Sequence, residues 1–264
     1  MNDTLEGHRA RRRFGQNFLV DTSVIAGIVA AVGPVAGDHM VEIGPGLGAL
    51  TLPLLQTAAR LTVIEIDRDL AARLVARFEH ETRFRLVLAD ALTVDLGALA
   101  TPGERLRLVG NLPYNISTPL LLHALAHAAS IHDLHVMVQR EVAERLAAAP
   151  GGGDYGRLSI ACQASCEVHS LLDVPPESFE PAPSIFSSVV RLVPRPTLPS
   201  AAVLHRLGQI THLAFSQRRK MVRQTLGKHF GAARLEALGI ALTARAEEIP
   251  VAAYLALAAE PLPA

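Results

Sequence analysis

Hydrophobic and polar residues alternate in blocks along the chain up to about Val193. Short apolar runs typical of buried strands precede stretches in which apolar residues recur every three or four positions, the spacing of one helix face. The run LTVIEI at 61–66, for example, precedes RDLAARLVARFEHE at 68–81, where Leu70, Leu74 and Phe78 share a face. Further strands are predicted at 39–43, 84–90, 105–111 and 134–139, and further helices from about 47 and over 118–130 and 140–149. This alternation predicts an α/β fold, a mostly parallel sheet with helices on both faces.

The pattern changes after residue 166. Two strand patterns flank a proline-rich loop in 167–193, which predicts an antiparallel end to the sheet, and PRPTLPS at 194–200 is typical of a linker. The rest predicts three or four short helices, which are too small to form an independent core and are expected to dock on the main domain. We therefore expect a main domain over 1–194, with an N-terminal arm over about 1–20, and a small helical domain over 195–264.

The 264 residues carry no formal net charge, which taken alone argues against a nucleic-acid partner. The charges are unevenly distributed, however. No Asp or Glu lies between Glu180 and Glu236, a stretch with nine cations, and the segment 7–20 has four Arg and no acid. Charge segregated in this way is able to form a basic face on a neutral protein. Half of the residues are hydrophobic, which excludes a disordered chain.

Cysteine and histidine usage predicts no metal site. The two cysteines, Cys162 and Cys166, make no disulfide framework and have only His169 nearby, so we interpret them as structural thiols in a reducing compartment. His123 and His127 share a helix face but lack a third ligand. No apolar run reaches the length of a transmembrane helix, and the basic N-terminus lacks the apolar segment of a secretory signal. A cytoplasmic protein with no membrane partner is therefore predicted.

The first predicted strand, HMVEI, leads into a glycine-rich turn, GPGLGALT. Gly44, Gly46 and Gly48 leave the backbone open where the next helix begins, so that a ligand is able to approach it. The spacing Gly44-x-Gly46-x-x-Ala49 also satisfies the dinucleotide fingerprint, so a nicotinamide dehydrogenase is an alternative, although no set of hydride-transfer residues is evident. A tight turn without any ligand is a second alternative.

Acidic residues end the next two predicted strands. Glu65 closes LTVIEI at about the distance where an acid accepts hydrogen bonds from ribose hydroxyls. Asp90 closes FRLVLAD, where a carboxylate is placed to accept from the exocyclic amine of an adenine. Each is alternatively a helix-cap or turn residue. Because the carboxyl ends of parallel strands meet at one edge of a sheet, we expect both acids and the glycine turn to line one crevice.

The fourth predicted strand ends in GNLPYNIS, which begins at Gly110. With the glycine turn and the two acids, this motif resembles the class I methyltransferases that use S-adenosylmethionine and methylate exocyclic amino groups of bases. An adenine amine is a poor nucleophile because its lone pair is delocalised, and acceptors on its N–H groups localise that pair. The Asn111 side-chain carbonyl and the Leu112 backbone carbonyl suit this role, with Pro113 fixing the backbone and Tyr114 stacking on the base. The base must be flipped out or unpaired to reach them.

Further motifs extend the resemblance over about Arg12 to Leu226. In chain order they are FGQNFL, VEIGPGLGALT, GNLPYNISTPLL, QREVAERL, YGRLS, FEPAPS and FSQRRKMVRQTL. This order is similar to that of the bacterial ribosomal RNA adenine dimethyltransferases. The resemblance implies a Rossmann-like class I fold and transfer of two methyl groups from S-adenosylmethionine to N6 of each of two adjacent adenosines. These adenosines lie in a hairpin loop near the 3′ end of small-subunit (16S) ribosomal RNA, within an immature 30S particle. We expect the protein to act as a monomer.

The resemblance also assigns roles to individual residues. Phe179, in FEPAPS, is expected to be a second aromatic beside the flipped base, and the alternative is a core residue beside a proline-rich turn. The expected catalytic and target-base residues are Asn111, Leu112, Pro113, Tyr114 and Phe179. The expected cofactor contacts are Asn17, Leu19, Gly44, Gly46, Glu65, Ile66, Asp90, Ala91 and Asn111.

Two Arg-rich segments, HRARRRFGQ and QRRKMVRQ, are expected to bind RNA phosphates without reading sequence, and a solvated charged face is the alternative. The predicted RNA-binding residues are Arg11, Arg12, Arg13, Arg140, Arg218, Arg219, Lys220 and Arg223. The chain also departs from the family. Where relatives commonly have a basic residue followed by Val-Asp-Ser, it has Ser184, Ile185, Phe186 and Ser187, which leaves the RNA contacts of that loop open. Arg140 occupies a position that is often Lys in relatives.

Two other functions share part of this pattern. Large-subunit adenine methylases of the antibiotic-resistance type have the same core motifs, but FSQRRKMVRQTL favours the small-subunit enzyme. An assembly or transcription factor that keeps the fold without turnover is the non-enzymatic alternative, and the intact Asn-Leu-Pro-Tyr argues against it.

Overall fold

The computed structural model of the chain describes residues 4–5, 8–9, 11, 15–57, 60–217 and 219–260. By internal contacts the chain divides into two compact units. The first comprises Met1–Ala143 and His169–Pro194, and the second comprises Glu144–Val168 and Arg195–Ala264. The expected domain boundary at residue 194 stays a prediction, and the contacts group residues 144–168 with the C-terminal segment.

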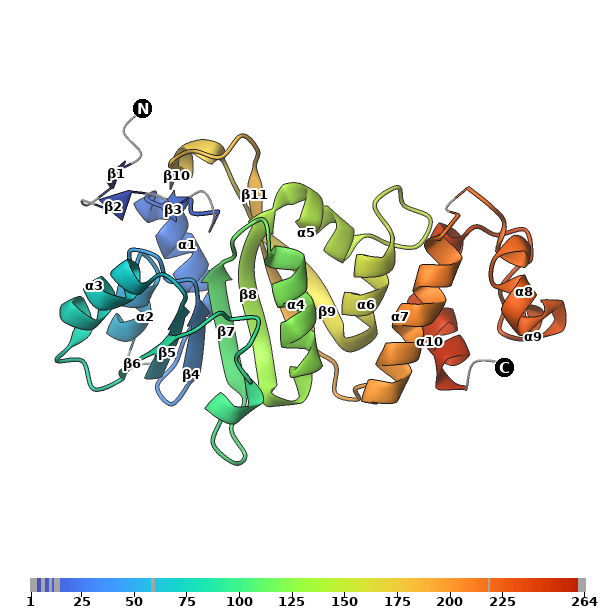
Figure 1. Cartoon of the computed structure of the whole chain (residues 1–264), viewed down its shortest axis with the longest axis horizontal. Coiled ribbons are helices and arrows are strands. Elements are labelled where there is room, and N and C mark those ends of the chain that lie inside the picture. Colours follow the sequence, from blue (N-terminus) through green and yellow to red (C-terminus); the bar gives the residue numbers. More distant parts are fainter. Residues whose placement is uncertain are drawn as a thin grey trace. The chain divides into compact units, whose positions relative to one another are not determined.

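A seven-stranded sheet with the order β6-β5-β4-β7-β8-β11-β9 contains all the longer strands (Figure 1). The strands are β4 (His39–Ile43), β5 (Arg60–Glu65), β6 (Phe84–Leu88), β7 (Leu106–Asn111), β8 (Ile131–Gln139), β9 (Cys166–Val174) and β11 (Ser187–Pro194). Strands β6, β5, β4, β7 and β8 pair in parallel, whereas β11 is antiparallel to β8. The mostly parallel sheet with an antiparallel end is therefore confirmed.

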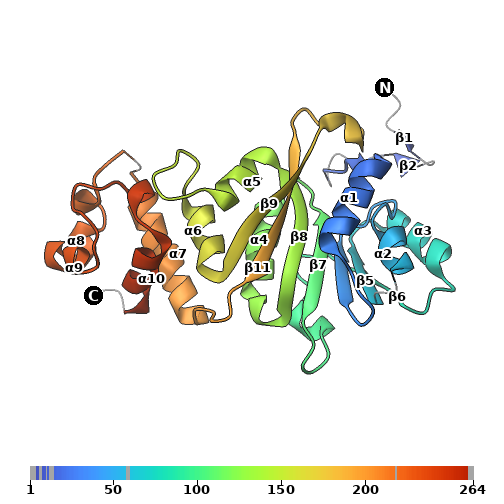
Figure 2. The same cartoon turned by 180° about the vertical axis from the view of Figure 1, so that it is seen from behind.

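Helices cover both faces of the sheet, as predicted: α1 (Thr22–Val32) lies on one face and α4 (Ser117–Ala126) on the other (Figures 1 and 2). In α3 (Arg68–Phe78) the apolar face of Leu70, Leu74 and Phe78 is buried. The helix expected from about residue 47 begins later, as α2 (Thr51–Gln56), because residues 46–50 form turns around the glycines. Helix α5 (Arg140–Ala147) follows β8 directly.

Two short strand pairs lie outside the main sheet. Strand β1 (Thr4–Leu5) pairs with β2 (His8–Arg9). Strand β3 (Phe18–Leu19) pairs antiparallel with β10 (Phe179–Glu180), so that Leu19 is opposite Phe179. This second pairing joins the N-terminal arm to the proline-rich loop that precedes β11, which the local sequence pattern does not predict. Leu19 of β3 and Phe179 of β10 both belong to the apolar core of the first unit.

The second unit is helical and has an apolar core of its own, to which residues 155–164 also contribute. This differs from the expectation that the C-terminal helices form no independent core. Its helices are α6 (Arg157–Ser165), α7 (Ala201–Phe215), α8 (Gly227–Phe230), α9 (Ala232–Ala237) and α10 (Val251–Ala259). Helix α7 is longer than the short helices predicted, and it packs against α6 and α10. Two buried tyrosines close the core: the hydroxyl of Tyr155 donates to the carbonyl of Ile249, and that of Tyr254 to the carbonyl of Ala246, both at 2.9 Å.

Both cysteines are buried in the structure. Burial raises the pKa of the Cys166 thiol to about 12, so the thiol is protonated at neutral pH and a poor nucleophile or metal ligand.

Short 3₁₀ turns occupy Gly97–Leu99, Ala128–Ser130, Pro176–Ser178, Val222–Gln224 and Ala246–Glu248. In the part of the chain that the structure describes, no helix has the length and apolarity needed to cross a membrane.

Candidate functional site

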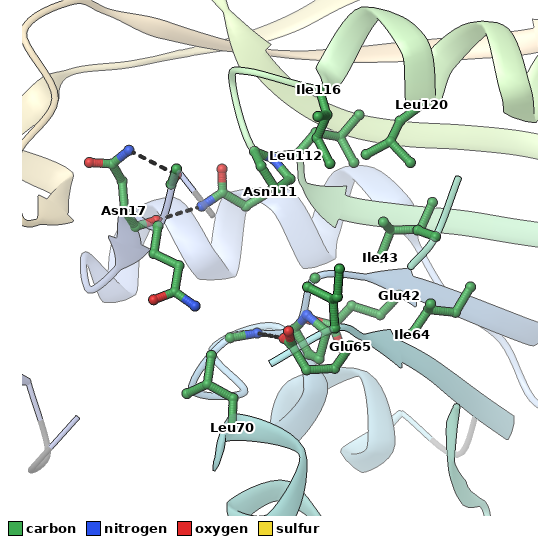
Figure 3. Close-up of a pocket in the computed structure, with 18 of the residues that line it drawn as sticks. Asn17, Glu42, Ile43, Ile64, Glu65, Leu70, Asn111, Leu112, Ile116 and Leu120 are labelled. Atoms are coloured by element: carbon green, nitrogen blue, oxygen red, sulfur yellow. Dashed lines mark hydrogen bonds between the residues drawn. The ribbon is translucent and has the colours of Figure 1, made fainter. Parts of the chain in front are cut away.

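The carboxyl ends of β4, β5, β6 and β7 surround a cavity of about 330 Å³ (Figure 3). Its wall combines these strand ends with residues 15–19 of the N-terminal arm and with Leu120 of α4. The volume and the position, outside the carboxyl edge of a parallel sheet, are those of small-ligand sites in α/β folds. The predicted crevice is therefore present, and every cofactor residue expected from the sequence lines it.

The glycine-rich turn forms one wall of the cavity. Gly44 and Gly46 line it, and both have positive φ angles, +66° and +60°. A Cβ atom at residue 46 would lie 3.1 Å from a ring carbon of Phe18. Glycine at this position therefore permits two things at once: the left-handed turn and the close packing of the arm over it.

Glu65 is held in place by backbone amides. Its side chain is only 5% exposed, and its two oxygens accept hydrogen bonds from the amides of Asp67 (2.8 Å) and Gly46 (3.4 Å). Burial raises the pKa of this carboxyl group, although the amides oppose the rise. Next to it, Ile66 is 45% exposed at the cavity wall. The pair offers a fixed acceptor for ligand hydroxyls and an apolar surface for a ring.

Asp90 serves a turn and lines the cavity at the same time. Its Oδ1 atom accepts from the amide of Leu92 at 3.0 Å, which is the turn role considered from the sequence. Among the described residues, Oδ2 has no hydrogen-bond partner. Asp90 and Ala91 both line the cavity. One carboxylate oxygen therefore supports the loop and leaves the other able to accept from a ligand.

The Asn111 side chain is oriented by the N-terminal arm. Its amide nitrogen donates to the backbone carbonyl of Asn17 at 2.9 Å, and the Asn17 amide in turn donates to the carbonyl of Gly15 at 3.3 Å (Figure 3). A carbonyl oxygen only accepts, so this contact assigns the nitrogen of Asn111 to it. The Oδ1 atom is left as an acceptor, with no donor to it among the residues described.

The next residues of the motif are held by the sheet. The Leu112 amide donates to the carbonyl of Met137 at 3.1 Å, which continues the pairing of β7 with β8. Within the described part of the chain no group donates to the Leu112 carbonyl. The hydroxyl of Tyr114 lies 2.6 Å from that of the buried Ser187, and burial raises the pKa of Tyr114. Leu112, Pro113 and Tyr114 all line the cavity, together with Asn111.

Glu42 is a cavity residue to which the sequence analysis gave no role. Its side chain is 1% exposed and accepts from the Thr51 hydroxyl at 2.6 Å. Burial raises the pKa of this carboxyl to about 8, so it is mostly protonated at neutral pH. A single acid within the otherwise apolar strand HMVEI was the available signal.

Phe179 does not line the cavity. It is 3% exposed, lies opposite Leu19 in the β3–β10 pair, and packs within the apolar core of the first unit. This is the core position considered as the alternative from the sequence. Its expected role beside a flipped base requires a ring face that is covered in this structure, and that role stays a prediction.

Two of the predicted RNA-binding residues form ion pairs with nearby carboxylates. Arg11 contacts Asp67 at 2.8 Å and also Asp69. Arg140 contacts Asp173 at 2.6 Å and lies over the ring of Phe186. An ion pair in the free protein does not exclude RNA binding, but it lowers the charge that each Arg offers to phosphates.

The other predicted RNA-binding residues divide into two groups. Arg219, Lys220 and Arg223 are exposed in the second unit. Arg12, Arg13 and Arg218 lie outside the described residues. Binding of RNA by any of them stays a prediction.

No cluster of three or more His, Cys, Asp or Glu with metal-site geometry occurs in the residues that the structure describes. One ring nitrogen of His123 lies 2.8 Å from the carbonyl of Val94, and His127 lies 3.5 Å from Asp95. These contacts are sufficient to explain both histidines as partners of the neighbouring loop.

Comparison with known proteins identifies the family. The profile described as ribosomal RNA adenine dimethylase matches residues 7–260. The ribosomal RNA small subunit methyltransferase A of Bordetella petrii is 53% identical over 254 residues, 95% of this chain and 94% of that protein. The protein of the same name from Pseudomonas putida is 48% identical over 259 residues, 98% of this chain and 97% of that protein.

Solved structures agree with this assignment. The 23S rRNA methyltransferase ErmE superposes with a TM-score of 0.72 at 28% identity, covering 92% of this chain and 98% of that one. A dimethyladenosine transferase from Plasmodium falciparum has a TM-score of 0.76 at 24% identity, covering 91% and 95%, and supports the fold. These matches do not support the nicotinamide dehydrogenase considered from the glycine spacing. Because the family profile spans nearly the whole sequence and its relatives are about half identical to it, the chain belongs to the ribosomal RNA adenine dimethylase family.

Proposed function

We propose that this protein transfers methyl groups from S-adenosylmethionine to N6 of two adjacent adenosines in a hairpin loop near the 3′ end of small-subunit ribosomal RNA. The family name supports adenine dimethylation of ribosomal RNA, and the names of the relatives support the small subunit. We further propose an immature 30S particle as the substrate and a cytoplasmic monomer as the active form.

The residues around the cavity fit S-adenosylmethionine. The fixed carboxylate of Glu65 suits a ribose hydroxyl, the Oδ2 atom of Asp90 suits the exocyclic amine of an adenine, and the exposed side of Ile66 suits an adenine ring. When bound, this cofactor supplies a methyl group made electrophilic by its sulfonium sulfur. The remaining work falls to the side chains and backbone of the protein.

Asn111 and Leu112 supply the acceptors for the target amine. Two carbonyl oxygens on its N–H groups favour a tetrahedral nitrogen with a localised lone pair. Neither carbonyl changes its protonation state, and no strong base is required because an alkylated amine loses its proton readily to water. Most of the rate acceleration then comes from holding the nitrogen in line with the methyl carbon.

The orientation of the Asn111 amide is the observation on which the proposal rests. The 2.9 Å hydrogen bond to the Asn17 carbonyl assigns the amide nitrogen to the arm and leaves Oδ1 as the acceptor. The acceptor is therefore oriented before the base arrives, and no reorganisation is needed at the moment of reaction.

The substitution Asn111→Ala tests this role. We expect single-turnover methyl transfer to immature small subunits to fall about 10²–10³-fold, the usual cost of removing one transition-state hydrogen bond. Binding of the particles should weaken by less than about tenfold, since one hydrogen bond contributes about 1 kcal/mol to a ground-state complex. Loss of the hydrogen bond between Asn111 and Asn17 could also affect cofactor binding or folding. Calorimetry with S-adenosylmethionine checks the first, and a melting curve checks the second. Equal losses in binding and in transfer contradict the assigned role.

The large-subunit alternative is supported by one observation, the likeness to the 23S rRNA methyltransferase ErmE over nearly its whole length. Parallel assays on immature small subunits and on protein-free large-subunit RNA separate the two substrates. Mass mapping of N6-methylated adenosines in ribosomal RNA, from cells with and without the protein, identifies the target positions. RNA binding with no methyl transfer to either substrate supports the non-enzymatic alternative instead.

A further inference from the structure

Two consecutive apolar side chains are exposed just before β11. Ile185 is 40% exposed and Phe186 is 43% exposed. An exposed aromatic ring is a surface on which a nucleobase is able to stack.

Arg140 completes this surface. Its guanidinium carbon lies 4.6 Å from the centroid of the Phe186 ring, and its backbone amide donates to the Phe186 carbonyl at 3.0 Å. Asp173 accepts from the Arg140 guanidinium at 2.6 Å and from the Ser188 hydroxyl at 2.7 Å. The ring and the cation are therefore positioned in the free protein, which lowers the entropic cost of binding a ligand to them.

Phe186 directly precedes, in sequence, a residue that contacts the target-base site. Ser187, the next residue along the chain, contacts the Tyr114 hydroxyl at 2.6 Å, and Tyr114 lines the cavity. Consecutive Cα atoms are about 3.8 Å apart. The backbone of Phe186 is thus one residue away from Ser187, whose hydroxyl contacts Tyr114, the tyrosine predicted to stack on the target base.

We propose that Phe186, with Arg140 stacked on it, binds an unpaired nucleobase of the RNA next to the flipped adenosine. The proposal rests on the proposed function, because it needs an RNA loop with its target base in the cavity. An exposed aromatic ring suits an unpaired nucleobase, since the ring stacks on the base, and the Arg140 guanidinium packed on the ring orients it. The exposed ring is then a substrate-positioning element.

Phe186→Ala tests the stacking contact, with Phe186→Tyr as the variant that keeps a ring. Loss of one stacked base costs about 1–3 kcal/mol, so KM for immature small subunits should rise about 5- to 150-fold in the Ala variant. We expect kcat and the affinity for S-adenosylmethionine to stay close to wild type, and the Tyr variant to restore most of the KM. Val35→Ala, which truncates an exposed apolar residue before the amino end of β4, away from the cavity at the carboxyl ends of the parallel strands, should leave KM unchanged.

Photo-crosslinking from Phe186→p-benzoylphenylalanine on the same particles identifies what the residue contacts. A crosslink to ribosomal RNA supports the proposal, and a crosslink to a ribosomal protein overturns it in favour of a protein contact. A KM within twofold of wild type for Phe186→Ala also overturns it. If the wild-type protein itself transfers no methyl group to any RNA, the proposed function fails instead, and the two failures are thereby distinguished.

Discussion

At the scale of single residues, the carboxyl group of Glu42 in the cavity wall has a strongly raised pKa. Burial raises its pKa to about 8, the Thr51 hydroxyl lowers it in part, and the neighbouring Glu65 adds to the rise. In the unfolded chain the same group titrates near its ordinary value of 4.5. Between these two values the folded state binds a proton that the unfolded state has already released. The contribution of Glu42 to stability is therefore present at low pH and is lost as pH rises through about 8.

The variant Glu42→Gln removes this titration while keeping the size of the side chain and an acceptor for Thr51. The free energy of unfolding of the variant should increase relative to wild type as pH rises from about 5 to about 8. The slope of the difference should approach about 1.4 kcal/mol per pH unit and level off above pH 8. Urea unfolding at several pH values measures it, and taking the difference cancels the other titrating groups. Parallel curves for the two proteins contradict a raised pKa for Glu42.

At the scale of secondary-structure elements, a buried ion network joins three strands and a helix end. Asp133 of β8 is fully buried and accepts from Arg107 of β7 at 2.9 and 3.0 Å and from Arg191 of β11 at 3.0 Å. Arg107 also donates to the carbonyl of Val32 at the end of α1, at 2.7 Å, and pairs with Asp38 at 2.8 Å. The network lies where the parallel part of the sheet changes to antiparallel, and it satisfies each buried charge with an opposite one.

Substituting Asp133→Ala leaves two cations without their shared buried carboxylate. Breaking a buried pair from one side typically costs about 3–5 kcal/mol, so we expect the free energy of unfolding to fall by that amount. Denaturant unfolding at neutral pH provides the measurement. Glu81→Ala, which removes the half-buried partner of Arg83 near the surface, serves as the control and should change stability far less. A similar small change in both variants would show that the Asp133 network does not hold the strands together.

At the scale of the whole molecule, the neutral net charge conceals a difference among the predicted RNA-binding residues: some are paired with carboxylates and others are exposed. Arg11 and Arg140, in the first unit, are paired with carboxylates, whereas Arg219, Lys220 and Arg223, in the second unit, are exposed. Exposed cations without acidic neighbours in sequence are the ones expected to release counterions when they contact phosphates. The second unit therefore carries the part of the predicted RNA footprint that is most sensitive to salt.

Replacing Arg219, Lys220 and Arg223 together by Ala should weaken binding to immature small subunits. It should also lower the slope of log K against log salt by about 2–3, since each phosphate contact contributes about 0.7–0.9. Equilibrium binding over a series of salt concentrations measures both quantities. Arg83→Ala is the control, because its charge is already paired with Glu81 at 2.6 Å, and it should keep the wild-type slope. If the triple variant keeps that slope too, the phosphate contacts lie on other residues.

Much of this molecule was predictable from local spacing. The helix face of Leu70, Leu74 and Phe78, the parallel strands and the glycine turn each depend on residues close together in sequence. The cavity followed from one additional rule, that parallel strands end at a common edge. Glu42 was missed because a lone acid inside an apolar strand does not by itself tell whether its side chain faces a ligand or a packed core.

By itself, then, the sequence determined the order of elements, the family, and the strand ends that form the cavity, because these follow from short-range periodicity and motif order. Only the tertiary structure decided that β3 pairs with β10, which brings the Asn17 carbonyl to Asn111 and buries Phe179. It likewise decided the contact of Tyr114 with Ser187. Such contacts join segments far apart in the chain, and they depend on how the elements pack in space, which no local pattern of residues encodes.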